Sequence, residues 1–197
     1  MTTANKFPGS SLLIQRSVVA VSWAPTTAYA IGQYVSNSGN IYRCATAGTS
    51  AASGGPTTTG TGISDGAGGL TWNFVVATGG FITVACMRKT DFTVNNEAVD
   101  ITNKTDGAWK QIQNFGVQSM SIGADGPFTD DTSHNLVMQD VMNKSIVPYK
   151  IITGRGDVFT GSFFAQSIQR TGEYNKEEQF ALKLESAAAI TYTPSPT

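Results

Sequence analysis

The sequence of 197 residues has very few of the residue types that build most catalytic and metal sites. It contains one histidine, His134, and two cysteines, Cys44 and Cys86. It has no spaced Cys/His pairs of the kind that bind zinc, no phosphate-binding loop motif and no GxGxxG motif. His134 falls on the polar first turns of an expected helix, where solvation is a better explanation than a Ser-His-Asp triad. The sequence therefore predicts no enzyme, no cofactor and no metal site.

Charge is scarce as well. Charged residues make up 14% of the chain, and 13 basic against 14 acidic side chains leave a net charge of −1. Surfaces that grip nucleic acid depend on Lys and Arg to neutralise phosphates, so such a surface is not expected. Arg16 interrupts the apolar run near the N-terminus, so we expect neither a signal peptide nor a membrane span there. Cys44 and Cys86 are expected to be two buried thiols in separate domains, not a disulfide.

What the sequence has instead is many Gly, Ser and Thr residues around alternating apolar positions, the pattern of a β-rich chain. Turns are predicted at Asn95–Asn96, where asparagine tolerates left-handed backbone, and at Gly123–Gly126. A first strand near Leu12 should pair with the strand that begins at Phe81. The predicted strands cover residues 11–19, 81–88, 91–95, 99–102, 117–122, 149–153, 158–170 and 180–184.

One helix is expected. Thr129 or Asp130 is a suitable N-cap for a helix that runs to about Lys144. Acidic residues at its start and Lys144 at its end suit the helix dipole. Its apolar stripe should consist of Leu136, Val137, Val141 and Met142.

Residues 20–78 differ in composition from the rest and contain only two charged residues, Arg43 and Asp65. We interpret them as a small all-β domain inserted into the first hairpin, so that residues 1–19 and 79–197 form one discontinuous domain. Residues 46–70 are mostly Gly, Ser, Thr and Ala and cannot build a core of their own. The core of the insert must therefore come from the larger side chains Trp23, Tyr29, Val35, Tyr42 and Trp72.

The insert loosely resembles the small chitin- and cellulose-binding modules of bacterial glycosidases. The resemblance implies that exposed aromatic rings stack on sugar rings. The candidate glycan-contacting residues are Trp23, Tyr34, Tyr42 and Trp72. A purely structural role for these aromatics is the alternative, because a small domain needs most of its aromatic side chains inside.

Eight segments after Phe81 follow one another in a characteristic order: residues 91–97, 99–104, 107–109, 119–122, 126–131, 156–161, 172–174 and 180–186. Taken in this order, they resemble the major tail protein (tail tube protein) family of long-tailed bacteriophages. The resemblance implies a mainly β fold, a tail-tube sandwich or barrel with one flanking α-helix. It further implies homo-hexameric rings that stack in the virion tail into a conduit for DNA ejection. The implied partners are copies of the chain itself and the tape measure, tail terminator and distal tail proteins, with assembly in the host cytoplasm.

In this family the segment that matches Thr105–Gly116 is a long loop that reaches an adjacent ring. The residues expected to make this contact are Trp109, Ile112 and Phe115, with one helical turn around Trp109–Ile112. The inner wall should be neutral or acidic so that DNA does not stick. Either the face with Asp91, Thr93 and Asn95 or the face with Asp100 and Thr102 is expected to line it.

Three other hypotheses remain open at this stage. The same fold could belong to a ring protein of a contractile secretion system. The insert alone would suit a carbohydrate-binding module. An enzyme is the third alternative, and no motif supports it.

Overall fold

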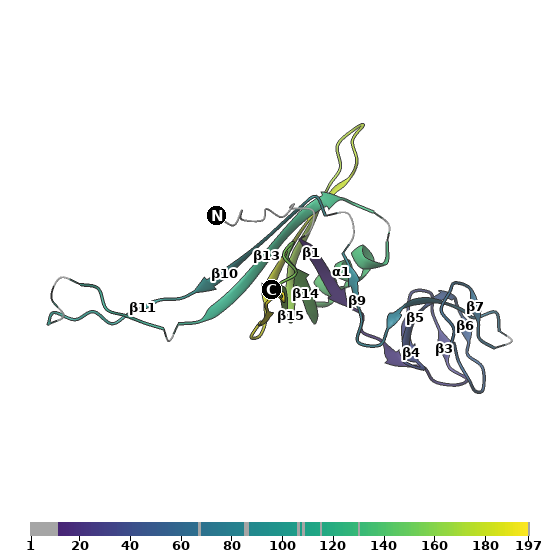
Figure 1. Ribbon diagram of the computed structural model, residues 1–197. Coiled ribbons are helices and arrows are strands. Elements are labelled where there is room, and N and C mark those ends of the chain that lie inside the picture. The colour runs from purple at the N-terminus through teal and green to yellow at the C-terminus, as the bar shows by residue number, and fades with distance from the viewer. Residues whose placement is uncertain are drawn as a thin grey trace. The chain divides into compact units, whose positions relative to one another are not determined.

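The computed structural model describes residues 12–66, 68–84, 87–105, 107, 109–114, 116–129 and 131–196. Contacts divide the chain into two compact units. The large unit combines Met1–Arg16 with Thr83–Thr197, and the small unit is Ser17–Ile82. Each unit has its own apolar core. Figure 1 shows the strands and the helix with their labels.

One sheet dominates the large unit. Its strands follow the order β10-β13-β16-β15-β14-β1-β9, with β17 paired to β15 outside this order. β1 and β9 are neighbours, as the first-hairpin prediction requires, and the amide of Val84 donates to the carbonyl of Ile14 at 2.9 Å. The strands are β1 (Leu13–Ser17), β9 (Phe81–Thr83), β10 (Lys89–Asn96), β13 (Gln118–Pro127), β14 (Ile146–Ile152), β15 (Val158–Thr171), β16 (Gln179–Ser186) and β17 (Thr191–Thr193).

Period-two alternation puts one face of this sheet into the core. In β16 the side chains of Phe180, Leu182 and Leu184 are buried, while Ala181 and Lys183 between them are exposed. The same alternation buries Met120, Ile122 and Ala124 of β13. The mainly β architecture with one flanking helix is therefore confirmed.

The turn predicted at Gly123–Gly126 is wrong, because β13 runs through these residues to Pro127. β13 pairs with β10 on one side and with β16 on the other, so the ladder fixes an extended backbone there. Gly123 lies opposite Asp91, and a Cβ at Gly123 would come within 2.4 Å of a carboxylate oxygen of Asp91. The glycine marks a close approach of a side chain and not a reversal of the chain.

The helix α1 (Thr132–Asn143) forms near the predicted place. Its N-cap is Asp131, whose side chain accepts from the amide of His134 at 3.0 Å. Lys144 ends the helix in the left-handed conformation, with φ of 54°. Of the predicted N-caps, Thr129 lies two residues before Asp131, and Asp130 lies outside the described residues.

The apolar stripe of α1 was only partly predicted. Leu136 and Val137 are buried as expected, but Met142 is 75% exposed. Asp140 is buried instead, because it binds Arg16 of β1 and Tyr149 of β14. Polar pairing replaces apolar packing at this side of the helix.

The prediction that His134 is solvated is also wrong. Its ring is buried, stacked on Phe128 and edge-on to Phe180. Nδ1 lies 2.8 Å from the carbonyl oxygen of Thr129, which can only accept, so the ring donates from Nδ1. His134 thus packs the first turn of α1 onto the sheet.

The small unit is all β. Its core residues are Tyr29, Val35, Tyr42, Cys44, Leu70 and Trp72, with Trp23, Ile63 and Phe74 packed against them. The five predicted core residues all belong to this group. The unit has a five-stranded sheet in the order β2-β4-β5-β8-β7 and a separate β3-β6 pair. Its strands are β2 (Val21–Ser22), β3 (Ala28–Tyr29), β4 (Tyr34–Asn37), β5 (Asn40–Thr46), β6 (Gly48–Thr49), β7 (Ile63–Ser64) and β8 (Thr71–Ala77).

A buried carboxylate ties the loops of the small unit together. One oxygen of Asp65 accepts from the indole N–H groups of Trp23 at 2.8 Å and Trp72 at 2.9 Å. The other oxygen accepts from the backbone amide of Ala51 at 3.1 Å. Asp65 is 3% exposed, and these three bonds stabilise its negative charge inside the unit.

Candidate assembly surfaces

The most distinctive feature of the large unit is a two-stranded arm. β10 and β13 stay paired from Lys89↔Asp125 to Asn96↔Gln118. Beyond this ladder, β11 (Val99–Asp100) pairs with β12 (Ile112–Gln113). Figure 1 shows β11 far from the body of the sheet, at the outer end of the arm.

The arm corrects two predictions. Asn95 and Asn96 do not reverse the chain, because both pair with β13 and the chain continues outward to β11. The helical turn around Trp109–Ile112 is absent, since Ile112 belongs to β12 and the described residues before it are not helical. Strand pairing thus extends further along the arm than local sequence indicates.

Apolar side chains on the arm lack cover from the described part of the chain. Trp109 is 81% exposed and Ile112 is 56% exposed. Phe115, the third predicted contact residue, lies outside the described residues. Other exposed apolar residues follow the arm toward the sheet. They are Val94, Val99, Ile101 and Val117. An exposed apolar stripe of this kind is typical of a surface that a partner covers.

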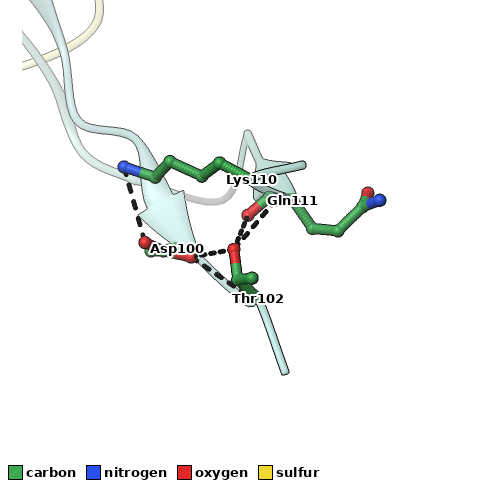
Figure 2. Close-up of polar contacts among 4 residues, drawn as sticks. All are labelled: Asp100, Thr102, Lys110 and Gln111. Atoms are coloured by element: carbon green, nitrogen blue, oxygen red, sulfur yellow. Dashed lines mark hydrogen bonds and ion pairs between the residues drawn. The ribbon is translucent and has the colours of Figure 1, made fainter. Parts of the chain in front are cut away.

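A polar network fixes the outer end of the arm (Figure 2). Asp100 accepts from the amide of Thr102 at 2.9 Å and from its hydroxyl at 2.6 Å. Lys110 lies 3.4 Å from the other oxygen of Asp100. The amide of Gln111 donates to the hydroxyl of Thr102 at 2.9 Å, which joins the two strands.

The network also changes the pKa of Asp100. The hydrogen bonds from Thr102, with a smaller contribution from the charge of Lys110, lower the pKa of Asp100 below its ordinary value. The shift favours the charged form of Asp100, which is the form that accepts these hydrogen bonds. The Asp-x-Thr spacing is a recognised turn signal, so the sequence did contain a cue for this network.

A cleft of about 240 Å³ lies where the arm leaves the sheet. We call it the root cleft. Val94, Met120, Phe159, Ile190 and Tyr192 give it an apolar floor and wall, and Gln118, Ser119, Ser186, Ala188 and Ala189 complete its lining. The rings of Phe159 and Tyr192 pack with centroids 5.0 Å apart.

The face of the sheet opposite the core is polar. Pairing places Lys89 opposite Asp125, Asp91 opposite Gly123, and Ser121 opposite Glu185, all on this face. With Lys183 added, the face of β10, β13 and β16 carries three carboxylates and two lysines. Its local charge is therefore slightly negative.

The sheet order ends at two edge strands, β10 and β9. In the described part of the chain, β10 pairs only with β13, over eight residues. A strand of this length has unpaired backbone groups along its outer side and can pair with another chain.

The candidate glycan residues of the small unit are not brought together as an exposed platform. Tyr42 and Trp72 are fully buried, so their predicted contact with a glycan is wrong. Trp23 is half-buried, and Gly55 lies against its ring so closely that a Cβ would come within 2.8 Å. Tyr34 is half-buried on β4. These aromatics therefore serve mainly the interior of the unit.

The Arg155-Gly156-Asp157 tripeptide is part of a turn. The turn that contains Arg155-Gly156-Asp157 uses the carboxylate of Asp157 internally, where it accepts from the amide of Ser195 at 2.9 Å. Among the described residues, no group of three or more His, Cys, Asp and Glu side chains could hold a metal ion. No helix in the described ranges is long and apolar enough to span a membrane.

Comparison with known proteins agrees with this geometry. The tail of an empty gene transfer agent particle, determined with helical refinement and C6 symmetry, is 30% identical, with a TM-score of 0.54. That match covers 57% of this chain and 86% of the other. The virion of a native gene transfer agent particle is also 30% identical, with a TM-score of 0.54, 57% of this chain covered and 88% of the other.

Among curated proteins, no sequence matches significantly. The family described as "Phage tail tube protein" matches residues 74–192. This match spans more than half of the sequence and includes the arm, α1 and the strands of the main sheet from β9 to β16, with most of β17. The chain therefore belongs to the phage tail tube protein family.

Proposed function

We propose that copies of this chain form homo-hexameric rings, and that the rings stack into the tail tube through which DNA leaves the particle. The family match over residues 74–192 carries this proposal. The C6 symmetry of the gene transfer agent tail supports six copies per ring. As a tail tube protein, the chain acts as a structural component, and we propose that it has no enzymatic activity.

The two sheet edges support ring closure. The sheet ends at β10 on one side and at β9 on the other. If the β10 edge of one copy forms hydrogen bonds with the β9 edge of the next copy, the unpaired backbone N–H and C=O groups of both edges are satisfied all round the ring. The polar face of β10, β13 and β16 then lines the passage. Its slightly negative charge lets DNA pass without the salt-dependent binding of a basic wall.

The arm supports stacking. Trp109 and Ile112 are large, exposed apolar side chains, and aromatic residues of this kind dominate interface energies. We propose that they contact another copy, together with Phe115. The tape measure, tail terminator and distal tail proteins are the proposed partners inside and at the ends of the tube, with assembly in the host cytoplasm.

The small unit is proposed to decorate the outside of the tube. Residues 20–78 would block the passage from inside and would separate the rings at a stacking face. The hydrogen bond from Val84 to Ile14 supports the proposal, because it pairs β9 with β1 on either side of the insert.

Electron microscopy of the purified protein tests the function. At high concentration we expect six-fold rings and tubes. The variant Trp109→Ala with Ile112→Ala should give folded subunits or rings that do not elongate. Tyr174→Ala is the matched control, because Tyr174 is a 94% exposed aromatic in a different hairpin of the large unit. Monomers at every concentration would contradict the proposal. Normal tubes from the double variant would show that the arm is not needed for stacking.

A further inference from the structure

The root cleft and the outer end of the arm have complementary properties. The cleft has a floor built on Met120, which is buried, and on the ring of Phe159. Gln118, Ser119 and Ser186 are the polar residues of its lining. An indole matches this combination, because its body is apolar and its N–H needs an acceptor. Trp109 is the exposed indole of the large unit, since Trp23 and Trp72 belong to the small unit and donate to Asp65.

The size of the cleft favours one side chain over a small-molecule ligand. Its volume of about 240 Å³ lies below the roughly 300–1,000 Å³ of most ligand pockets. Its lining contains no charged residue and no histidine or cysteine. A cofactor or a nucleotide would find no group there to bind its charge.

The outer end of the arm lies away from the cleft of its own chain. Val94, Gln118 and Ser119 of the cleft belong to the last three residue pairs of the β10/β13 ladder, at the root of the arm. Thr102 is six residue steps beyond Asn96, which is about 20 Å of extended backbone. Figure 1 shows β11 far from the sheet, and the β11/β12 pair together with the network around Asp100 (Figure 2) ties the two sides of the outer end to each other.

We infer that the root cleft receives the outer end of the arm of a second copy of this chain, with Trp109 as the anchoring side chain. The inference rests on the proposed function and adds the receiving site to it. Arm and cleft belong to every copy, so each copy both gives an arm and receives one, and the contact repeats through the assembly. The network of Asp100 and Thr102 fixes the arm before binding, which reduces the entropy lost on association.

Blocking the cleft is the first test. Ala188 lines the cleft and is exposed, so Ala188→Trp should fill the cleft without disturbing the fold. We expect the concentration needed for tube formation to rise about tenfold or more, as for loss of an interface anchor. Ser53→Trp adds the same side chain at an exposed loop of the small unit and should leave assembly unchanged.

Crosslinking is the second test. Lys110→Cys places a thiol next to Trp109, and Ala188→Cys places one at the cleft. A mixture of the two single variants, treated with a short bis-maleimide in assembled tubes, should give covalent dimers. A chain with both substitutions should give a ladder of multimers, and each single variant alone is the control.

The outcomes separate the two proposals. Tubes that form normally with Ala188→Trp, or a doubly substituted chain that gives no multimer ladder, would overturn the inference and leave the tube function standing. A wild-type protein that forms neither rings nor tubes would overturn both. Crosslinking confined within one chain would show that the arm folds onto its own cleft, against the inference.

Discussion

The buried ion pair between α1 and the sheet allows a stability prediction with a defined size. Arg16 of β1 binds both oxygens of Asp140 of α1, at 2.5 and 2.6 Å, and the hydroxyl of Tyr149 donates to Asp140 at 3.1 Å. The side chains of Arg16 and Asp140 are only 5% and 3% exposed. Burial opposes the charged form of Arg16, but the hydrogen bonds and charge of Asp140 outweigh it and raise the pKa of Arg16.

Asp140→Ala would leave the guanidinium of Arg16 and the hydroxyl of Tyr149 buried without this partner. Removing one member of a buried ion pair costs about 3–5 kcal/mol of unfolding free energy. For a unit of this size, such a loss lowers Tm by roughly 10–20 °C. Glu177→Ala is the control, because Glu177 pairs with Arg88 on the surface, where both side chains are more than 60% exposed. That substitution should cost about 0.5 kcal/mol or less.

The two units can be followed separately in the unassembled subunit. Trp23 and Trp72 lie in the small unit, so buried tryptophan fluorescence reports its unfolding, and far-ultraviolet circular dichroism reports both units. Asp140→Ala should shift the dichroism transition and leave the buried-tryptophan transition in place. Arg16→Met with Asp140→Leu should recover most of the loss, since apolar pairs often replace buried ion pairs. A loss below about 1 kcal/mol, or a double variant no better than the single one, would refute the reasoning.

Three further predictions concern the remaining parts of the chain. Asp65→Ala should destabilise the small unit by about 2–5 kcal/mol, because the indole N–H groups of buried Trp72 and half-buried Trp23 lose their acceptor, and the tryptophan fluorescence transition of the small unit measures the loss. The pKa of Asp100 is lowered, so its stabilisation of the arm is present above its ordinary pKa and is lost as pH falls through the lowered value. In the wild type, the amides of Thr102 and Gln111 should therefore lose protection from hydrogen exchange as the pH falls through that range. The variant Asp100→Asn has no carboxylate to protonate and should not show this loss, so equal pH profiles of protection in the two proteins would contradict the prediction. A chain in which Asn-Gly replaces residues 20–78 should still form tubes, and these tubes should be thinner because the outer decoration is missing. An insoluble product would contradict the two-domain interpretation.

Local alternation predicted the strands well because burial on one face repeats along each of them. Phe180, Leu182 and Leu184 show the pattern without interruption, and the structure buries all three. The core of the small unit was predictable for another reason. Its sequence offers few large side chains besides its aromatics, so most of them had to enter the core.

The errors arose where tertiary pairing overrides a local signal. Asn95–Asn96 and Gly123–Gly126 contain turn residues, yet the β10/β13 ladder keeps both segments extended. His134 and Asp140 look like surface residues of a helix, yet each finds polar partners inside the molecule. A sequence pattern cannot identify these partners, because Arg16 is 124 residues away from Asp140.

The same limit explains why the sequence could name exposed residues of the arm but not the root cleft. The exposed anchors Trp109 and Ile112 lie in one short segment, so a resemblance along the sequence can indicate them. The cleft draws Val94 from β10, Met120 from β13, Phe159 from β15 and Tyr192 from β17, and no spacing in the chain connects these four. A contact that repeats between identical copies needs both halves. The sequence therefore indicated the half that protrudes, and only the folded sheet brought the residues of the receiving half together.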